Sequence, residues 1–320
     1  MATTQSVPQI YVAREHVHVL VNNIEARRIQ EEECGELGDL LQFQDFPWYD
    51  GDGARRALAR TTDGQTAGYL AEAECAADLS RLQRVLDPWE QEVLRSVAVD
   101  TADAVEEVAQ TLAFGLTEFA VAGRLAAGLW ERGLEPIVVL VSGDARTERR
   151  RHPLPTSKRI DHDAILSVCG RRRGLVASVT RSVHRGPVPE ERRVRQAQVA
   201  AVDAAAMACS RPGISLREVF AAMREAYARQ GHPQAWTQHH QGGLSGYASR
   251  TKLATDETDL MLEAGMVLAY NPSLPGAKSE DTCLLGPDGV SVVSQSRRNW
   301  PLLAVDVEGR VWNRPMVWAR

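Results

Sequence analysis

Residues 239–247 read His-His-Gln-Gly-Gly-Leu-Ser-Gly-Tyr, and the rest of the chain is best understood outward from them. Two adjacent histidines stand just before a glycine-rich turn. Histidine is the side chain best suited to proton transfer or metal binding near neutral pH, and glycine lets a backbone bend tightly and approach a ligand closely. The stretch therefore predicts a functional site, and its neighbours along the chain decide the kind of site.

The composition indicates a soluble globular protein. The chain has 320 residues, of which 44% are hydrophobic and 25% charged, and a net charge of -5. Mild acidity argues against a surface for nucleic acid or an anionic membrane, and no apolar run reaches the length of a membrane span. The first six residues lack the basic-then-apolar order of a signal peptide. We expect a cytoplasmic protein that binds neither nucleic acid nor membrane.

The five cysteines are scattered and form no C-x-x-C pair. They predict buried thiols in a reducing compartment rather than disulfides or a zinc site, and Cys169 is expected to be inert. The basic cluster at residues 146–151 predicts a solvated loop.

Residues 1–85 predict a small α/β domain. Apolar and polar residues alternate as in a strand hairpin, and later segments are helix-prone or turn-rich. The expected elements are a hairpin over 9–22, an acidic helical segment over 24–40, an aromatic loop over 46–53, a strand over 66–70 and an alanine-rich helix after it.

Residues 86–320 predict a larger α+β domain. Asp87 is a good N-cap, Pro88 fits a first helical turn and Glu90 can close a capping box. A long amphipathic helix then runs to about Leu112, and Thr117 can cap a second helix. The remaining expected elements are a strand over 137–141, a hairpin of 164–169 and 174–183 joined by a turn at 170–173, helices over 190–209 and 216–230, strands over 266–271, 278–285 and 290–293, and a loop over 272–276. Helix pairs that alternate with antiparallel strands are typical of an α+β fold.

Five motifs occur in an order that is specific. They are His152-Pro-Leu-Pro-Thr, Val179-Thr-Arg, the stretch 239–247, Asn271-Pro and Lys278-Ser-Glu-Asp-Thr. This order resembles the pita-bread fold family (peptidase family M24), which holds creatinase, prolidase, aminopeptidase P and methionine aminopeptidase. The resemblance implies a pita-bread domain over 86–320, a shortened α/β N-terminal domain over 1–85, and a homodimer.

The peptidases of that family hold two divalent metals with two aspartates, one histidine and two glutamates, because cations of this kind need carboxylates to offset their charge. The resemblance places these five ligands at Ser167, Ser178, His240, Asn271 and Glu280, and a further family histidine at Tyr247. Three of the four carboxylates are therefore absent. Hydroxyl groups are expected to fill the space of the two aspartates. We expect no metal and no cofactor.

Creatinase is the more useful comparison within the family, because it hydrolyses a C–N bond without metal. The resemblance matches His152 to its catalytic histidine and Glu280 to one of its two guanidinium-binding glutamates. The other glutamate falls near Thr180, where this chain has no carboxylate. A creatine-like guanidinium substrate is therefore disfavoured.

Several of these residues also have a purely structural interpretation. His152 is either a catalytic acid or base or a histidine that caps a carbonyl group. Of His239 and His240, one can orient the other. Glu280 either forms a buried ion pair, with Lys278 or an arginine, or positions a water molecule.

The same holds for the predicted substrate-binding residues. Tyr247 and Arg250 fit packing and a surface salt bridge equally well. Arg250 and Lys278 are the candidate cations for a substrate carboxylate. Asn271 either binds a substrate amide or serves the turn before Pro272.

The sequence thus predicts a metal-independent creatinase-like enzyme that hydrolyses a C–N bond in a small amino-acid-like or amide substrate, or in a short peptide. His152 and His240 are the acid/base candidates, and Glu280 orients or activates water. The expected substrate-binding residues are His239, Tyr247, Arg250, Asn271, Lys278 and Thr180. The alternatives are a lyase, cyclase or isomerase, an inactive peptide-binding module, or a metallopeptidase with other ligands.

Overall fold

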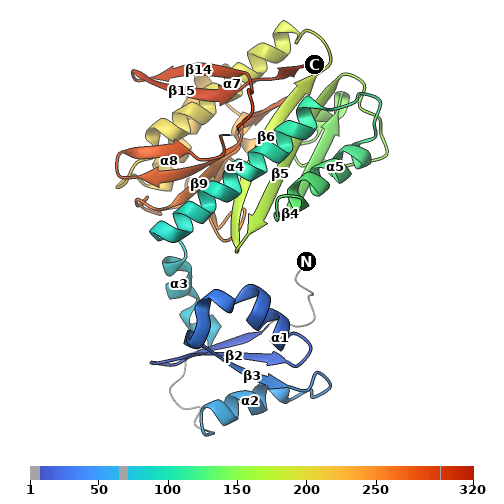
Figure 1. Cartoon of the computed structure of the whole chain (residues 1–320). Coiled ribbons are helices and arrows are strands. Elements are labelled where there is room, and N and C mark those ends of the chain that lie inside the picture. The colour runs from blue at the N-terminus through green and yellow to red at the C-terminus, as the bar shows by residue number, and fades with distance from the viewer. Residues whose placement is uncertain (1–7, 65–70, 296) are drawn as a thin grey trace. The chain divides into compact units, whose positions relative to one another are not determined.

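The computed structural model describes residues 8–64, 71–295 and 297–320 (Figure 1). The chain divides into two compact units, Met1–Ala76 and Ala77–Arg320. The sequence placed this boundary somewhat later, between residues 85 and 86. The predicted strand at 66–70 lies outside the described residues.

The first unit contains a three-stranded sheet in the order β1-β2-β3. Strands β1 (Gln9–Val12) and β2 (Val17–Asn22) form the predicted antiparallel hairpin, whereas β3 (Leu41–Phe46), which the sequence did not predict, pairs parallel to β2. The segment between β2 and β3 forms three short helical pieces, and the last of them is kinked at Gly38, whose φ is positive. These pieces are α1 (Ala26–Arg28), η1 (Ile29–Glu33) and η2 (Gly35–Leu40), and helix α2 (Gly53–Thr61) follows β3. Helix α3 (Glu72–Leu82) contains the boundary between the two units.

The second unit opens with two helices whose starts are set by local sequence. The Asp87 carboxylate accepts from the Glu90 N–H at 2.8 Å, and the Glu90 carboxylate accepts from the Asp87 N–H at 2.7 Å. This capping box starts α4 (Pro88–Gln110), and the Thr117 hydroxyl caps α5 (Glu118–Trp130). Both predicted caps are confirmed.

Helices α4 and α5 pack on a four-stranded sheet in the order β16-β6-β5-β4. Its strands are β4 (Glu135–Gly143), β5 (Asp163–Arg172), β6 (Leu175–His184) and β16 (Trp318–Ala319). The predicted turn at 170–173 was wrong. Arg173 and Gly174 both have positive φ and form a two-residue turn, which matches the twist of a hairpin. Gly170 lies within β5, where a Cβ would come to 2.6 Å from the Thr101 hydroxyl.

The second half of this unit places α7 (Glu190–Cys209) and α8 (Leu216–Arg229) over a five-stranded sheet in the order β13-β12-β9-β7-β8. The strands are β7 (Gly242–Ser245), β8 (Lys252–Leu253), β9 (Val267–Tyr270), β12 (Asp281–Gly286) and β13 (Gly289–Val292). The predicted loop at 272–276 instead belongs to a small hairpin, β10 (Ser273–Leu274) with β11 (Ala277–Lys278).

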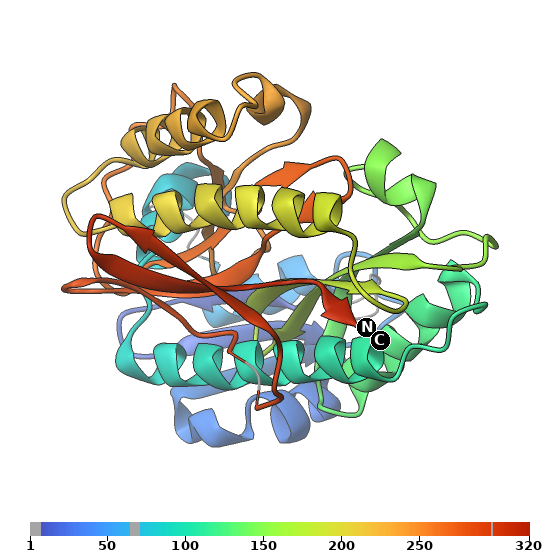
Figure 2. The ribbon, with the colours of Figure 1, turned by 90° about the horizontal axis from the view of Figure 1, so that it is seen from above.

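Each of the two larger sheets of the second unit therefore has its own pair of helices and its own apolar core. A further hairpin, β14 (Leu302–Val307) with β15 (Arg310–Pro315), lies against α7, as Figure 2 shows from above. The sequence did not predict this hairpin. Short helical segments α6 (Ala145–Arg149) and η3 (Ala235–Gln238) precede the two loops that carry histidines. No helix within the described residues is long and apolar enough to cross a membrane.

Two predictions about surface and core need correction. All five cysteines are free, but only Cys169 and Cys283 are buried, and the other three are partly exposed. The cluster at 146–151 is not simply a solvated loop, because Arg146 pairs with the buried Glu118 carboxylate. Glu118 also accepts from the Gly143 N–H and so holds the end of β4 against α5.

Candidate active site

A cavity of about 300 Å³ in the second unit brings together most of the predicted site residues. The predicted residues reach it from separate segments: His152 follows α6, Arg250 follows β7, Asn271 follows β9, and Lys278 and Glu280 share one segment. Its complete lining is Val138, Leu140, His152, Ser167, Val168, Cys169, His240, Ser249, Arg250, Asn271, Lys278 and Glu280. The two halves of the unit both contribute, since Ser167 lies on β5 and Asn271 directly follows β9.

Glu280 is held from three sides. Its Oε1 accepts from Arg250 Nη2 at 2.7 Å, and its Oε2 accepts from Lys278 Nζ at 2.8 Å and from the Thr180 hydroxyl at 2.6 Å. Burial opposes ionisation of this carboxyl, but the two cations outweigh burial and hold its pKa well below the usual range. A carboxylate so strongly stabilised is a poor proton acceptor. The geometry therefore supports the ion-pair and orienting role of Glu280 over water activation.

Three histidines lie together, and two of them, His152 and His240, line the cavity. His152 follows α6, whereas His239 and His240 stand between η3 and β7. The Nε2 atoms of His152 and His239 are 2.9 Å apart, and the rings of His239 and His240 stack with centroids 4.5 Å apart. Burial, with Lys278 next, lowers the pKa of His152 and takes that of His239 to about 2. Burial and Arg250 lower the pKa of His240 to about 4. All three imidazoles are therefore neutral near pH 7.

The tautomer of His240 follows from its backbone contact. Its Nδ1 accepts a hydrogen bond from the Gly242 N–H at 3.3 Å. A neutral imidazole carries one proton, so the other ring nitrogen, Nε2, holds it. His240 can thus donate a proton from Nε2 but cannot accept one there.

Asn271 is 2% exposed and lines the cavity, yet its side-chain oxygen has no hydrogen-bond partner. A buried amide oxygen without a donor is uncommon, because the lost hydration is not replaced. The atom is therefore available to a donor on a bound molecule.

The model of metallopeptidase family M24 matches residues 92–290. The chain belongs to this family. No curated protein sequence matches it.

Solved structures of M24 proteins share the fold. The X-Pro aminopeptidase of Thermotoga maritima MSB8 has a TM-score of 0.76 at 13% identity, over 98% of this chain and 90% of its own. The prolidase of Pyrococcus furiosus has a TM-score of 0.73 at 17% identity, over 91% and 90%. The dipeptidase PepE of Mycobacterium ulcerans has a TM-score of 0.72 at 18% identity, over 100% and 89%. The predicted pita-bread fold with a small N-terminal domain is confirmed.

The five residues that the resemblance matches to the M24 metal ligands do not form an adequate ligand set. Arg250 Nη1 donates to the Ser178 hydroxyl at 3.1 Å, and its Nη2 binds Glu280, so a guanidinium connects two of the positions matched to ligands. The Ser167 hydroxyl is 2.7 Å from that of Thr180. Neutral hydroxyls and one already neutralised carboxylate cannot offset two dications. The residues present do not fit the family's dinuclear site.

The glycines at 242 and 243 are required by the packing of the sheet rather than by a ligand. A Cβ on Gly242 would lie 2.2 Å from the Ala269 carbonyl oxygen, and one on Gly243 would lie 2.2 Å from that of Lys252. Both residues also have positive φ. Strand β7 thus needs glycine because it passes between β8 and β9, and the expectation that these glycines make room for a ligand is wrong.

Tyr247 lies apart from the cavity. Its hydroxyl donates to the Glu90 carboxylate and its ring packs on Gly174. Burial, with the Glu90 hydrogen bond next, raises the pKa of this phenol. The structure supports the packing alternative for Tyr247.

One wall of the cavity was not predicted from the sequence. Val138 and Leu140 on β4 pair with Cys169 and Ser167 on β5, so four side chains at alternate positions share a face. Alternate residues of β5 face the cavity, and this alternation could have been read from the sequence. The pairing of β5 with β4, which adds Val138 and Leu140, could not. Burial raises the pKa of Cys169, whose Sγ lies 3.2 Å from the Ser178 hydroxyl, so it is a neutral thiol.

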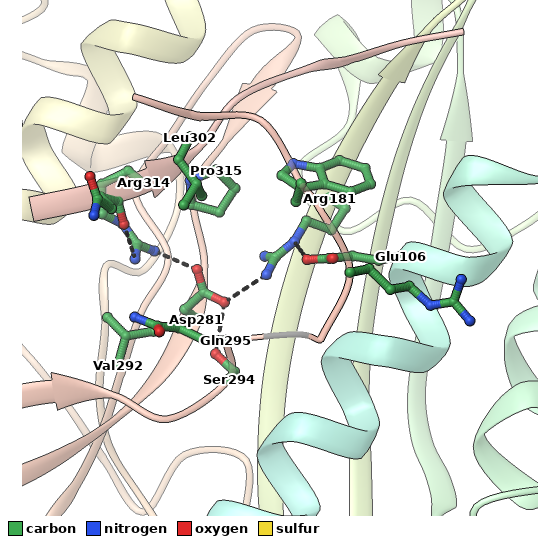
Figure 3. A pocket seen from close by; sticks show the side chains of 12 residues that line it. Glu106, Arg181, Asp281, Val292, Ser294, Gln295, Leu302, Arg314 and Pro315 are labelled. Atoms are coloured by element: carbon green, nitrogen blue, oxygen red, sulfur yellow. Dashed lines mark hydrogen bonds and ion pairs between the residues drawn. The ribbon is translucent and has the colours of Figure 1, made fainter. Parts of the chain in front are cut away.

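A buried ion network lies behind the site (Figure 3). Asp281 accepts from Arg181 at 3.1 Å and from Arg314 at 2.7 Å, and Arg181 also donates to Glu106 at 2.7 Å. Arg181 directly follows Thr180, and Asp281 directly follows Glu280; Thr180 and Glu280 are the pair that meets at the cavity. Successive strand residues point to opposite faces. The network therefore fixes β6 and β12 together and sets where Thr180 meets Glu280.

Proposed function

We propose that this protein is a metal-independent enzyme of the M24 fold that hydrolyses a C–N bond in a small amino-acid-like or amide substrate. One observation carries the proposal: two imidazoles that are neutral near pH 7 line a cavity beside the buried cations Arg250 and Lys278. Such a cavity can move protons and stabilise negative charge without a metal ion.

The reaction needs a water molecule and two proton transfers. His152 takes a proton from water as its oxygen adds to the substrate carbonyl carbon. The resulting oxyanion faces Arg250 or Lys278. As the C–N bond breaks, the imidazolium of His152 passes this proton to the departing nitrogen, while the Nε2–H of His240 donates a hydrogen bond to the oxyanion; the products are a carboxylic acid and an amine, and both imidazoles are neutral again. The hydrogen bond between His152 and His239 lets His152 exchange its proton with the neighbouring ring.

Glu280 acts in this scheme as a positioning residue. Its carboxylate fixes the directions of Arg250 Nη2 and Lys278 Nζ. Without it the two cations would repel each other, and both would lose the geometry that an oxyanion requires.

The substrate class and assembly are also proposals. The similar structures are named as a dipeptidase, a prolidase and an X-Pro aminopeptidase, which supports short peptides or peptide-like amides as candidate substrates. A homodimer remains the proposed assembly.

The experiment measures amine release from a panel of dipeptides and N-acyl amino acids, with and without a chelator. We expect turnover that the chelator leaves unchanged and that both His152→Ala and His240→Ala reduce by about 100-fold or more. His232→Ala is the matched control, because His232 contacts Gln198 and does not line the cavity.

Two outcomes would overturn the proposal. Turnover that survives both substitutions contradicts the proton transfer by His152 and the hydrogen bond from His240. The absence of turnover, together with peptide binding that both variants retain, favours the inactive binding module. That alternative draws support from Glu280, whose two oxygens are already bound by cations.

A further inference from the structure

The charge of the cavity is unusual for a site that accepts peptides. Arg250 and Lys278 contribute two positive charges, and Glu280 is the single carboxylate among the described residues that line it. Their side chains are 12%, 8% and 6% exposed, so water screens them weakly. Because the three imidazoles nearby are neutral, the cavity carries a net charge of one positive unit.

The hydrogen-bonding groups show the same bias. Arg250, Lys278 and the Nε2 of His240 are donors, and the oxygens of Glu280 are already engaged. Among the described residues that line the cavity, Asn271 has a buried acceptor atom without a partner, its side-chain oxygen. A ligand that satisfies this set brings several acceptor atoms and one donor.

We infer that the ligand of this cavity is a monoanion whose amino nitrogen is blocked, such as an N-acyl amino acid, and not a zwitterionic dipeptide. Its carboxylate pairs with Lys278 and Arg250, and its amide N–H donates to the Asn271 oxygen. A free ammonium group has no carboxylate to meet and is repelled by both cations.

The shape of the cavity agrees with this class. Val138 and Leu140 supply an apolar wall of the cavity. An acyl group or a small aliphatic side chain can pack there, and a charged one cannot without losing its hydration. This inference rests on the proposed function only in taking the cavity as the substrate site.

Three ligands separate the effect of the ammonium group from that of the carboxylate. N-acetyl-L-alanine and glycyl-L-alanine share one backbone, but the second carries an added ammonium. N-acetyl-L-alanine amide lacks the carboxylate. Titration calorimetry on the full-length protein should show N-acetyl-L-alanine binding about tenfold or more tightly than either of the others, which corresponds to ~1.4 kcal/mol.

Substitution then assigns the preference to the cavity. Lys278→Met should weaken the binding of N-acetyl-L-alanine about tenfold and reduce the ratio of its affinity to that of glycyl-L-alanine. Lys252→Met is the matched control, since this lysine is exposed on β8 and outside the cavity, and should change neither value. Circular dichroism confirms that both variants are folded.

The results separate this inference from the proposed function. Equal or tighter binding of glycyl-L-alanine would overturn the inference while leaving amide hydrolysis possible. Preferential binding of N-acetyl-L-alanine without turnover would leave the inference standing and contradict the proposed reaction. An unchanged preference in Lys278→Met would also overturn it, because the charge would then act elsewhere.

Discussion

Asp281→Asn tests how much the ion network behind the site contributes to stability. The Asp281 side chain is 2% exposed and accepts from Arg181, Arg314 and Ser294 at 3.1, 2.7 and 2.7 Å. Asparagine has nearly the same shape but one acceptor oxygen, and its amide N–H groups would face a guanidinium. Breaking a buried ion pair by removing one partner typically costs about 3–5 kcal/mol. We expect a loss in that range, because the negative charge shared by two buried arginines disappears.

The matched control is Asp256→Asn. Asp256 accepts from Arg224 at 2.8 and 2.9 Å, but its side chain is 58% exposed. An exposed pair contributes about 0–1 kcal/mol. Urea unfolding followed by tryptophan fluorescence and circular dichroism gives both values. Equal losses for the two variants would refute the network's role in fixing β6 and β12.

Three further predictions concern the same unit. His240 binds a proton below about pH 6.5 in the unfolded chain, but only near pH 4 in the folded protein. The free energy of unfolding should therefore fall as the pH drops from about 6.5 to about 4 and stay level above that range. The urea midpoints at about pH 7.5 and about pH 5 should differ less in His240→Gln than in the unsubstituted protein. Gly243→Ala should cost about 2 kcal/mol or more, because a Cβ there meets the Lys252 carbonyl oxygen at a φ of +149°, whereas Gly123→Ala in α5 meets nothing and should stabilise by about 0.5–1 kcal/mol in the same assay. Metal analysis of the purified protein should find less than one bound ion per chain, and a chelator should leave the unfolding midpoint unchanged; stoichiometric metal would contradict the ligand comparison.

Local chemistry explains which elements the sequence predicts well. The capping box at Asp87 and Glu90 acts within one helical turn, and the β5–β6 hairpin joins neighbouring residues. Strand β3 was missed because its partner β2 precedes it by a helical segment, and its parallel pairing has no local turn signal. The β14–β15 hairpin was missed although its turn contains Gly309, whose positive φ is typical of turns.

The candidate site divides along the same line. Motif order brought His152, His240, Asn271 and Glu280 into one prediction, and the cavity contains all four. Sequence could not show that Arg250 reaches Glu280, because that contact depends on how the loop after β7 folds back toward the Lys278–Glu280 segment. The sequence also could not show that neighbouring strands require the glycines of 239–247, because the carbonyl groups that lie close to them belong to residues that are distant in the sequence.

The ion balance links the loss of metal ligands to the ligand class inferred above. In the M24 peptidases, four carboxylates offset the charge of two dications. Here Glu280 alone remains, and Arg250 and Lys278 bind it directly. One carboxylate cannot neutralise two cations, so the site keeps a positive charge that the family's ligand set would not leave. A buried net charge is costly unless a counter-ion enters. If Ser167, Ser178 and Asn271 stand at the ligand positions that the resemblance implies, the electrostatics that disfavours the metals there also favours an anionic ligand.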